Sequence, residues 1–285
     1  MKLFILLNFF SIFLISITFA DFNGGGLAKN NTFLYTGDSY KFFSRPYYIS
    51  LVSKQRNIIT APIKWNFNQW LVFTGVIGSI SIAYHSDTSI NDTLLNQQNT
   101  LTKVYANTGY VIGHPINLLP LIGLTYTYGY ATKNSKLQHL GLSSFESLLF
   151  TLTVVKTSKM LVHRHRPNET QSHSTFDGPG FSLSEINQSF PSGHSAAIWA
   201  VATSIALEYN ESSWIKLSSY CVASLVALSR LFDNAHWASD VIAGSALGYS
   251  IARYTFFNNQ TKDINRVFLT PLFYNQTGLA ITMAI

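Results

Sequence analysis

The sequence predicts a helical and unusually apolar protein, in which strands are expected only at the C-terminal end. Hydrophobic residues make up 47% of the 285 residues and charged residues only 11%, against roughly 25% charge in ordinary soluble domains. The mean hydropathy is +0.16, and long runs of the chain carry no charge. This composition argues against disorder and favours helices whose apolar faces are buried or contact lipid.

The net charge indicates which classes of partner the protein is expected to bind. Nineteen Lys and Arg residues stand against thirteen Asp and Glu residues, a formal charge of +6. On a chain this poor in charge, the excess favours anionic substrates, anionic lipid or both. No run rich in Lys and Arg is present, so nucleic acid is not an expected partner. The single cysteine, Cys221, excludes an internal disulfide and a Cys-based zinc site, and we expect it to be buried in the packing.

The first 20 residues are typical of an export signal, which we predict as a signal peptide over residues 1–20. Lys2 provides a basic start, Leu3–Phe19 is apolar without a charge, and small residues precede Asp21. An uncleaved first membrane helix is the alternative, because about 17 apolar residues lie at the lower limit for spanning a bilayer. In either case, the chain is expected to enter an export pathway.

Residues 21–64 are predicted to be an irregular or short-helical lead-in, with Pro46 and Pro62 as breakers. The runs Trp65–Tyr84 and Val104–Thr132 contain no Asp, Glu, Lys or Arg. Both are long enough to span a bilayer, allowing for kinks, and we expect them to be the first membrane crossings.

Four later apolar runs are shorter, and each ends at a charged residue. Their lengths fit core helices of a bundle, although charges gathered at one end of a membrane bundle give the same pattern. We therefore predict a helical domain over residues 65–257. The tail, 258–285, is expected to form a short β-hairpin. The four runs are 147–155, 195–207, 217–229 and 241–252.

The first of three polar segments that carry chemistry runs from Lys159 to Pro167. Lys159 and Arg166 are seven residues apart, about two helical turns, so both cations are expected on one side of a helix that Pro167 ends. Spacing alone does not say which of residues 163–165 points inward. Taken by itself, the segment fits equally well a basic helix end that extends toward water or headgroups.

The second segment is Pro191-Ser192-Gly193-His194, directly before an apolar helical run. A Ser cap followed by Gly leaves backbone N–H groups free at a helix N-terminus, where they bind anions. His194 is placed to exchange protons with whatever binds there. The plainer interpretation is a Ser-capped helix with an incidental histidine.

The third segment, Ser229 to Asp240, contains Arg230, His236 and Asp240. His236 and Asp240 are at i and i+4, which predicts one helix face on which the carboxylate fixes the imidazole and leaves its other nitrogen as a nucleophile. Arg230 can bring a bidentate guanidinium to phosphoryl oxygens. Alone, a His-x-x-x-Asp pair is weak evidence, because many such pairs only hydrogen bond along a helix.

The three segments together resemble the motifs of the type 2 phosphatidic acid phosphatase superfamily. The family pattern is Lys-x6-Arg-Pro, then Pro-Ser-Gly-His, then Ser-Arg-x5-His-x3-Asp, and all three are present without a substitution. The resemblance covers about residues 145–253. It implies an all-α helical bundle, expected here to be membrane-embedded, with the pocket at the ends of the helices that carry the motifs.

The resemblance also implies a role for each motif residue. His236 is the implied nucleophile, Asp240 holds it, and His194 protonates the leaving oxygen and then activates water. The implied mechanism uses no metal and no cofactor. The phosphoryl oxygens are implied to be bound by Lys159, Arg166, Ser192, Gly193 and Arg230.

Within the family, we expect a membrane phosphatase that hydrolyses a lipid phosphate or diphosphate at the periplasmic face of a bacterial inner membrane. A soluble periplasmic acid phosphatase of broad specificity is the alternative. A second alternative is a vanadium haloperoxidase, which uses the same pocket to hold vanadate. Outside the enzymes, a non-enzymatic anion or lipid-headgroup binder would keep the cations but could dispense with the two histidines, so the presence of both histidines and of Asp240 argues against it. The sequence leaves the oligomeric state open.

Overall fold

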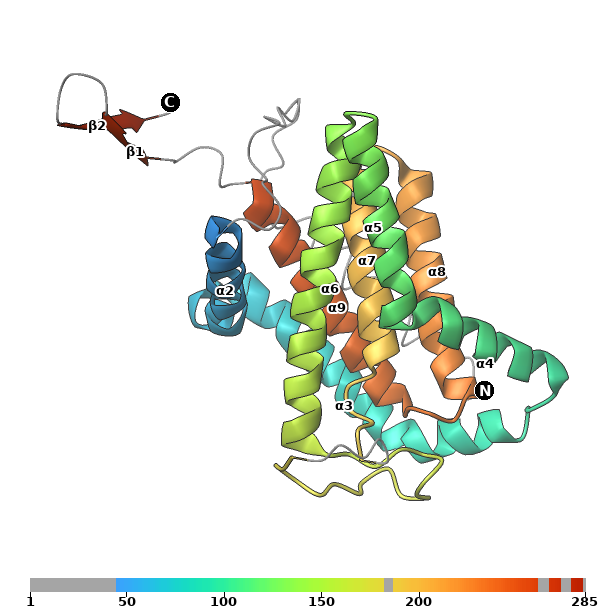
Figure 1. Cartoon of the computed structure of the whole chain (residues 1–285). Helices are drawn as coiled ribbons and strands as arrows, with labels where there is room; N and C mark the ends of the chain where they lie inside the picture. The colour runs from blue at the N-terminus through green and yellow to red at the C-terminus, as the bar shows by residue number, and fades with distance from the viewer. Residues whose placement is uncertain (1–44, 182–186, 261–266, 273–277, 284–285) are drawn as a thin grey trace.

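Helices form the fold, which confirms the predicted all-α class (Figure 1). The structure, a computed structural model, describes residues 45–181, 187–260, 267–272 and 278–283. The predicted signal peptide therefore lies outside the described residues. The helices are α2 (Arg45–Thr60), the short 3-10 helix η1 (Ala61–Lys64), α3 (Phe67–Leu95), α4 (Thr100–Gly113), α5 (Pro115–Ala131), α6 (Ser135–Val162), α7 (Gly193–Glu208), α8 (Ser213–Phe232) and α9 (Ala238–Gln260).

Small polar residues begin most of these helices. Each cap accepts a hydrogen bond from an otherwise unpaired N–H in the first turn. In α3 and α4, the third residue of the helix also accepts a bond from the N–H of the cap, which completes a capping box. The helix boundaries are therefore set locally by the sequence. The side-chain caps on this pattern are Asn66, Asn99, Asn134, Ser192 and Ser212.

Helix α7 is the centre of the bundle and packs against α6, α8 and α9. Twelve of its 16 residues are buried, as expected for a helix surrounded on all sides. Two glycines of α9 allow the closest approach. A Cβ at Gly244 would lie 2.3 Å from Ser192 O, and one at Gly248 would lie 2.1 Å from Ala196 O. These glycines therefore bring the start of α9 against the start of α7.

We expect Gly244→Ala to destabilise the protein by about 1–3 kcal/mol, because an overpacked contact with backbone must push two helices apart. Activity should fall as well, because the displaced atoms belong to Ser192. Gly78→Ala in α3 is the matched control, since its Cβ would meet nothing within 4 Å. Thermal unfolding of both variants checks this, and equal melting temperatures would contradict the close approach.

The described part of the predicted lead-in, residues 45–64, is helical, and the expectation that Pro46 and Pro62 act as breakers is wrong. Pro46 is the second residue of α2, and Pro62 lies in the first turn of η1. Proline is tolerated at these positions because the first N–H groups of a helix have no partner inside the helix. The two prolines therefore start helices here instead of breaking them.

The two long uncharged runs, which were predicted to be the first membrane crossings, fall in α3, α4 and α5. The first lies in α3, which continues beyond it through Asp87 and Asp92 to Leu95. The second is divided between α4 and α5, because His114 is extended, caps α5 with its side chain and is followed by Pro115. Neither run is a helix on its own.

By length and composition, α8 is the one helix among the described residues that is long and apolar enough to cross a membrane. Its outer face carries Cys221, which is exposed, together with Val222 and Leu225, which are about half exposed. The expectation of a buried cysteine was therefore wrong. The physical reason is that α8 lies at the edge of the bundle, so one side of its apolar stretch has no protein partner in the described structure.

In the tail, two short strands, β1 (Val267–Leu272) and β2 (Gly278–Met283), are drawn as an antiparallel pair outside the bundle (Figure 1). Nothing beyond this pairing supports a hairpin, which stays a prediction. The fold class depends on the helices alone.

Candidate active site

The three polar segments meet at one end of the bundle. Figure 1 shows α6 and α8 running toward this end, and α7 and α9 starting from it. Lys159 is in the last turn of α6, Ser192 caps α7, and Arg230 is in the last turn of α8. Residues that are far apart in the chain are thus gathered by the antiparallel order of the helices.

The first segment does not form the helix that the spacing predicted. Helix α6 ends at Val162, because His163 takes a left-handed conformation (φ 43°) and donates its N–H to Lys159 O. Arg166 therefore lies beyond the helix, on the segment that leads to Pro167. The two cations come to the same end of the bundle through this turn and not through a shared helix face.

Ser192 behaves as the predicted cap of α7. Its Oγ accepts from Ser195 N (3.5 Å) and from Ser195 Oγ (2.9 Å), and its side chain is fully buried. Because Ser192 Oγ is the acceptor in both contacts, its own proton can be donated to a bound anion. The N-terminus of α7 adds the positive end of the helix dipole at the same place.

Arg230 is buried with unused donors. Its Nη2 donates to Asp233, whereas Nε and Nη1 have no hydrogen-bond partner in the described part of the chain. Its guanidinium lies 5.3 Å from the ring centre of Tyr110. The His194 ring lies 5.0 Å from the same Tyr110 ring, and His194 Nε2 is also buried without a partner in the described structure. Buried donors in this state are expected to serve a ligand.

His236 is 3% exposed and lies among these cations. Burial lowers the pKa of His236 well below its ordinary value, and the charges of Lys159, Arg166 and Arg230 lower it further. A lowered pKa means that the imidazole is neutral at pH 7. A neutral ring nitrogen has the free lone pair that a nucleophile needs.

The predicted pairing of His236 with Asp240 differs in its geometry. Helix α9 begins at Ala238, so His236 precedes the helix and does not share a helix face with Asp240. The His236 Nδ1 to Asp240 Oδ2 distance is 4.0 Å, too long for a hydrogen bond. Asp240 Oδ2 instead accepts from Ser189 Oγ (2.6 Å) and Trp237 N (3.0 Å). These two bonds connect the Asp240 carboxylate to the loop before α7, through Ser189, and to the start of α9, through Trp237.

Sequence reasoning missed three residues that surround Asp240. Arg164 is 1% exposed and donates from Nη1 to Asp240 Oδ1 (2.6 Å) and from Nη2 to Asp87 Oδ2 (2.7 Å). Ser189 is the third. A signal for Asp87 was present, since it is the first acidic residue after the uncharged run of α3. The inward direction of Arg164 follows only from the left-handed turn at His163.

The fold is a helical bundle with the three motif segments gathered at one end, and the chain was compared with known proteins. Residues 140–263 match the family model described as PAP2 superfamily, and the resemblance carried by the motifs is confirmed.

Three of the relatives are lipid A 1-phosphatases, and two of them are described below. The chain is similar to that of Porphyromonas gingivalis, with 39% identity over 88 residues, 30% of this chain and 19% of the relative. It is similar to that of Rhizobium etli with 32% identity over 122 residues, 41% of this chain and 51% of the relative. The chain thus spans about half the length of these relatives or less.

A solved structure, the first transmembrane PAP2 type phosphatidylglycerolphosphate phosphatase from Bacillus subtilis, is 20% identical with a TM-score of 0.44. The match covers 75% of this chain and 94% of that one.

Proposed function

We propose that the protein is a metal-independent phosphatase that hydrolyses a lipid phosphate or diphosphate through a phosphohistidine. The observation that carries the proposal is the burial of His236, just before α9, where the charges of Lys159, Arg166 and Arg230 act on its imidazole. A nucleophile and a phosphoryl-binding set at one helix end are what covalent phosphoryl transfer requires.

In the proposed first step, a ring nitrogen of His236 attacks phosphorus and the bond to the leaving oxygen breaks. Nδ1 is the nitrogen nearer Asp240, so Nε2 is the one left for attack. Burial and the charge of Arg230 lower the pKa of His194, so in this scheme His194 takes up a proton when the anionic phosphate neutralises the nearby cations, and it gives that proton to the leaving oxygen. In the second step, water attacks the phosphohistidine, His194 takes a proton from that water, and phosphate leaves with His236 restored.

The proposed substrate charge is met by side chains and not by a metal. Lys159, Arg166 and Arg230 neutralise the phosphoryl oxygens, with the Ser192 hydroxyl and the N–H of Gly193 at the helix N-terminus. Arg230 is held by Asp233, and Ser192 by Ser195, so these two donors can stabilise the transition state with little reorganisation.

A lipid substrate is supported by the relatives and by the surface. Three of the relatives are lipid A 1-phosphatases. Large apolar side chains are exposed on α3, α5 and α8, and they form a surface that is unusual for a soluble protein but suited to acyl chains. Examples with at least half of their surface exposed are Phe67, Leu71, Ile82, Ile116, Leu121, Leu124, Trp214 and Leu225. These features favour the membrane enzyme over a soluble periplasmic phosphatase.

Assays of the purified protein in detergent test the reaction. We expect turnover of lipid phosphates to persist in EDTA, because no metal takes part, and to be blocked by vanadate, which mimics the five-coordinate phosphoryl transition state. A panel of lipid monophosphates and diphosphates identifies the substrate. Activity lost in EDTA and restored by Mg²⁺ would contradict the proposal, and activity that is soluble without detergent would favour the alternative.

We further propose that the site faces the periplasm from a bacterial inner membrane. Three lysines, Lys133, Lys136 and Lys216, lie at the end of the bundle opposite the site. Basic residues at membrane ends favour the cytosolic side. The cations of the site are left out of this comparison because they serve as phosphate ligands.

Single-cysteine labelling tests the orientation. In a Cys221→Ser background, Gln171→Cys lies at the site end and Glu211→Cys at the opposite end, and both positions are exposed. We expect a membrane-impermeant maleimide to label Gln171→Cys, but not Glu211→Cys, in intact spheroplasts. Detergent should then expose both. The reverse labelling pattern would reject a periplasmic site.

A further inference from the structure

Three charged side chains lie buried together near His236, and none of them belongs to the proposed phosphoryl-binding set. Arg164 is 1% exposed, and Asp87 and Asp240 are both 0% exposed. Arg164 comes from the segment after α6, Asp240 from the start of α9 and Asp87 from α3, outside the three motifs. The guanidinium therefore joins two carboxylates from different elements.

All five N–H groups of Arg164 are used. Nη1 donates to Ser239 Oγ (2.7 Å) and Asp240 Oδ1, and Nη2 donates to Asp87 Oδ2 and His173 O (2.8 Å). Nε donates to His173 O as well (3.0 Å). No donor of Arg164 is left for a phosphoryl oxygen. Its role therefore differs from that of Arg230, whose Nε and Nη1 have no hydrogen-bond partner among the described residues.

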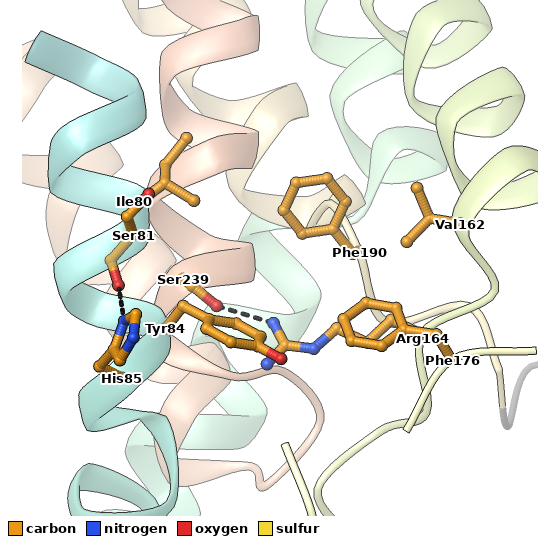
Figure 2. A pocket seen from close by; sticks show the side chains of 9 residues that line it. All are labelled: Ile80, Ser81, Tyr84, His85, Val162, Arg164, Phe176, Phe190 and Ser239. Carbon is orange, nitrogen blue, oxygen red and sulfur yellow. Dashed lines mark hydrogen bonds between the residues drawn. The ribbon is translucent and has the colours of Figure 1, made fainter. Parts of the chain in front are cut away.

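Aromatic rings cover the guanidinium. Its central carbon lies 5.1 Å from the ring centre of Tyr84, 5.6 Å from that of Phe176 and 5.5 Å from that of Trp237. Figure 2 shows Arg164 reaching Ser239 with Tyr84 and Phe176 nearby, at the edge of a hollow of about 260 Å³. These rings limit the access of water to the ion pairs and strengthen them.

Asp87 fixes the other side of the cluster. Its Oδ1 accepts from Ser239 N (3.0 Å) and its Oδ2 from Ser239 Oγ (2.5 Å), so it pairs an otherwise free N–H at the start of α9. Two carboxylates and one guanidinium leave the cluster with one net negative charge. That charge lies beside His236, which becomes positive when its nitrogen is phosphorylated.

We propose that Asp87 and Arg164 are positioning residues for the phosphohistidine chemistry, which hold Asp240 in the orientation and the charge balance that His236 needs. This inference rests on the proposed function. Arg164 fixes Oδ1 of Asp240, and Ser189 and Trp237 fix Oδ2, so the carboxylate cannot rotate away from the imidazole. Neither Asp87 nor Arg164 contacts the phosphoryl group in this scheme.

A double-mutant cycle with Arg164→Gln and Asp87→Asn tests the proposal. Arg164→Gln leaves two buried carboxylates facing each other, and we expect kcat to fall about 100-fold while KM changes less than about threefold. Asp87→Asn alone should lower kcat about tenfold, since the cluster loses its net charge. The double variant again has one net negative charge, so it should be at least about fivefold more active than Arg164→Gln. A purely structural role predicts no such rescue.

Two control variants and the inhibition by vanadate distinguish a positioning role from a general loss of structure. Arg56→Gln and Asp92→Asn are the matched controls, because both side chains are exposed, and Asp92 is on the same helix as Asp87. Inhibition by vanadate should stay within about threefold of wild type in all cycle variants, since the phosphoryl ligands are intact. A double variant no more active than Arg164→Gln overturns the proposal.

If Arg164→Gln does not fold, Arg164→Lys provides the second test. One ammonium keeps the charge but cannot hold both carboxylates in a fork, so we expect about a tenfold loss of kcat. Wild-type turnover in Arg164→Lys also overturns the proposal. Failure of the proposed function is a separate result, since wild-type protein would then hydrolyse none of the phosphate esters.

Discussion

Replacing His236 with alanine is expected to reduce kcat by at least about 10⁴-fold, because the covalent route then has no nucleophile. The residual rate should come from the cations and the α7 N-terminus, which still stabilise phosphoryl charge. Stopped-time assays at saturating substrate measure this loss. Acid-labile phosphate should be trapped on wild-type protein and be absent from the variant.

Two other variants, His85→Ala and Asp240→Asn, test whether the loss of activity is specific to His236. His85→Ala is the control, since its ring is exposed on α3 outside the cation cluster, and it should retain full turnover. Asp240→Asn should retain more activity than His236→Ala, because the nucleophile is present and only its support is weakened. Turnover near the wild-type level in His236→Ala would reject the assignment of the nucleophile.

Arg230→Lys is expected to lower kcat by about 10²–10³-fold, although the charge is kept. The guanidinium is held by Asp233 on one side and by the Tyr110 ring, with Nε and Nη1 directed away from other described partners. A lysine cannot present two N–H groups in this fixed fork, and the loss of a preorganised donor costs about 3–4 kcal/mol in the transition state.

Arg253→Lys in α9 is the matched control for Arg230→Lys. Its guanidinium lies 5.2 Å from the ring centre of Phe257, at the far end of α9 from His236, so turnover should change less than about threefold. Weaker inhibition by vanadate in Arg230→Lys alone would support a direct phosphoryl contact. Equal inhibition of Arg230→Lys and wild-type protein would count against that contact.

The structure leaves the proposed roles of the motif residues as predictions, but it changes the geometry on which they were first based. The pairs Lys159 with Arg166 and His236 with Asp240 were expected on helix faces, and in both pairs one partner lies outside the helix. The spacing rule failed because a helix can end between two motif residues. At His163 the end is a left-handed turn that no proline or glycine marks.

By itself, the sequence determined the helical class, the order of the three segments and the residue types that we propose to bind phosphate. These depend on local features: uncharged apolar runs, Asn and Ser caps, and motif spacing that is independent of how the helices pack. Tertiary structure alone decided that Arg164 points inward, that Asp87 joins the site and that Gly244 must have no side chain. Each of these depends on contacts between elements more than 50 residues apart, which periodicity along the chain does not encode.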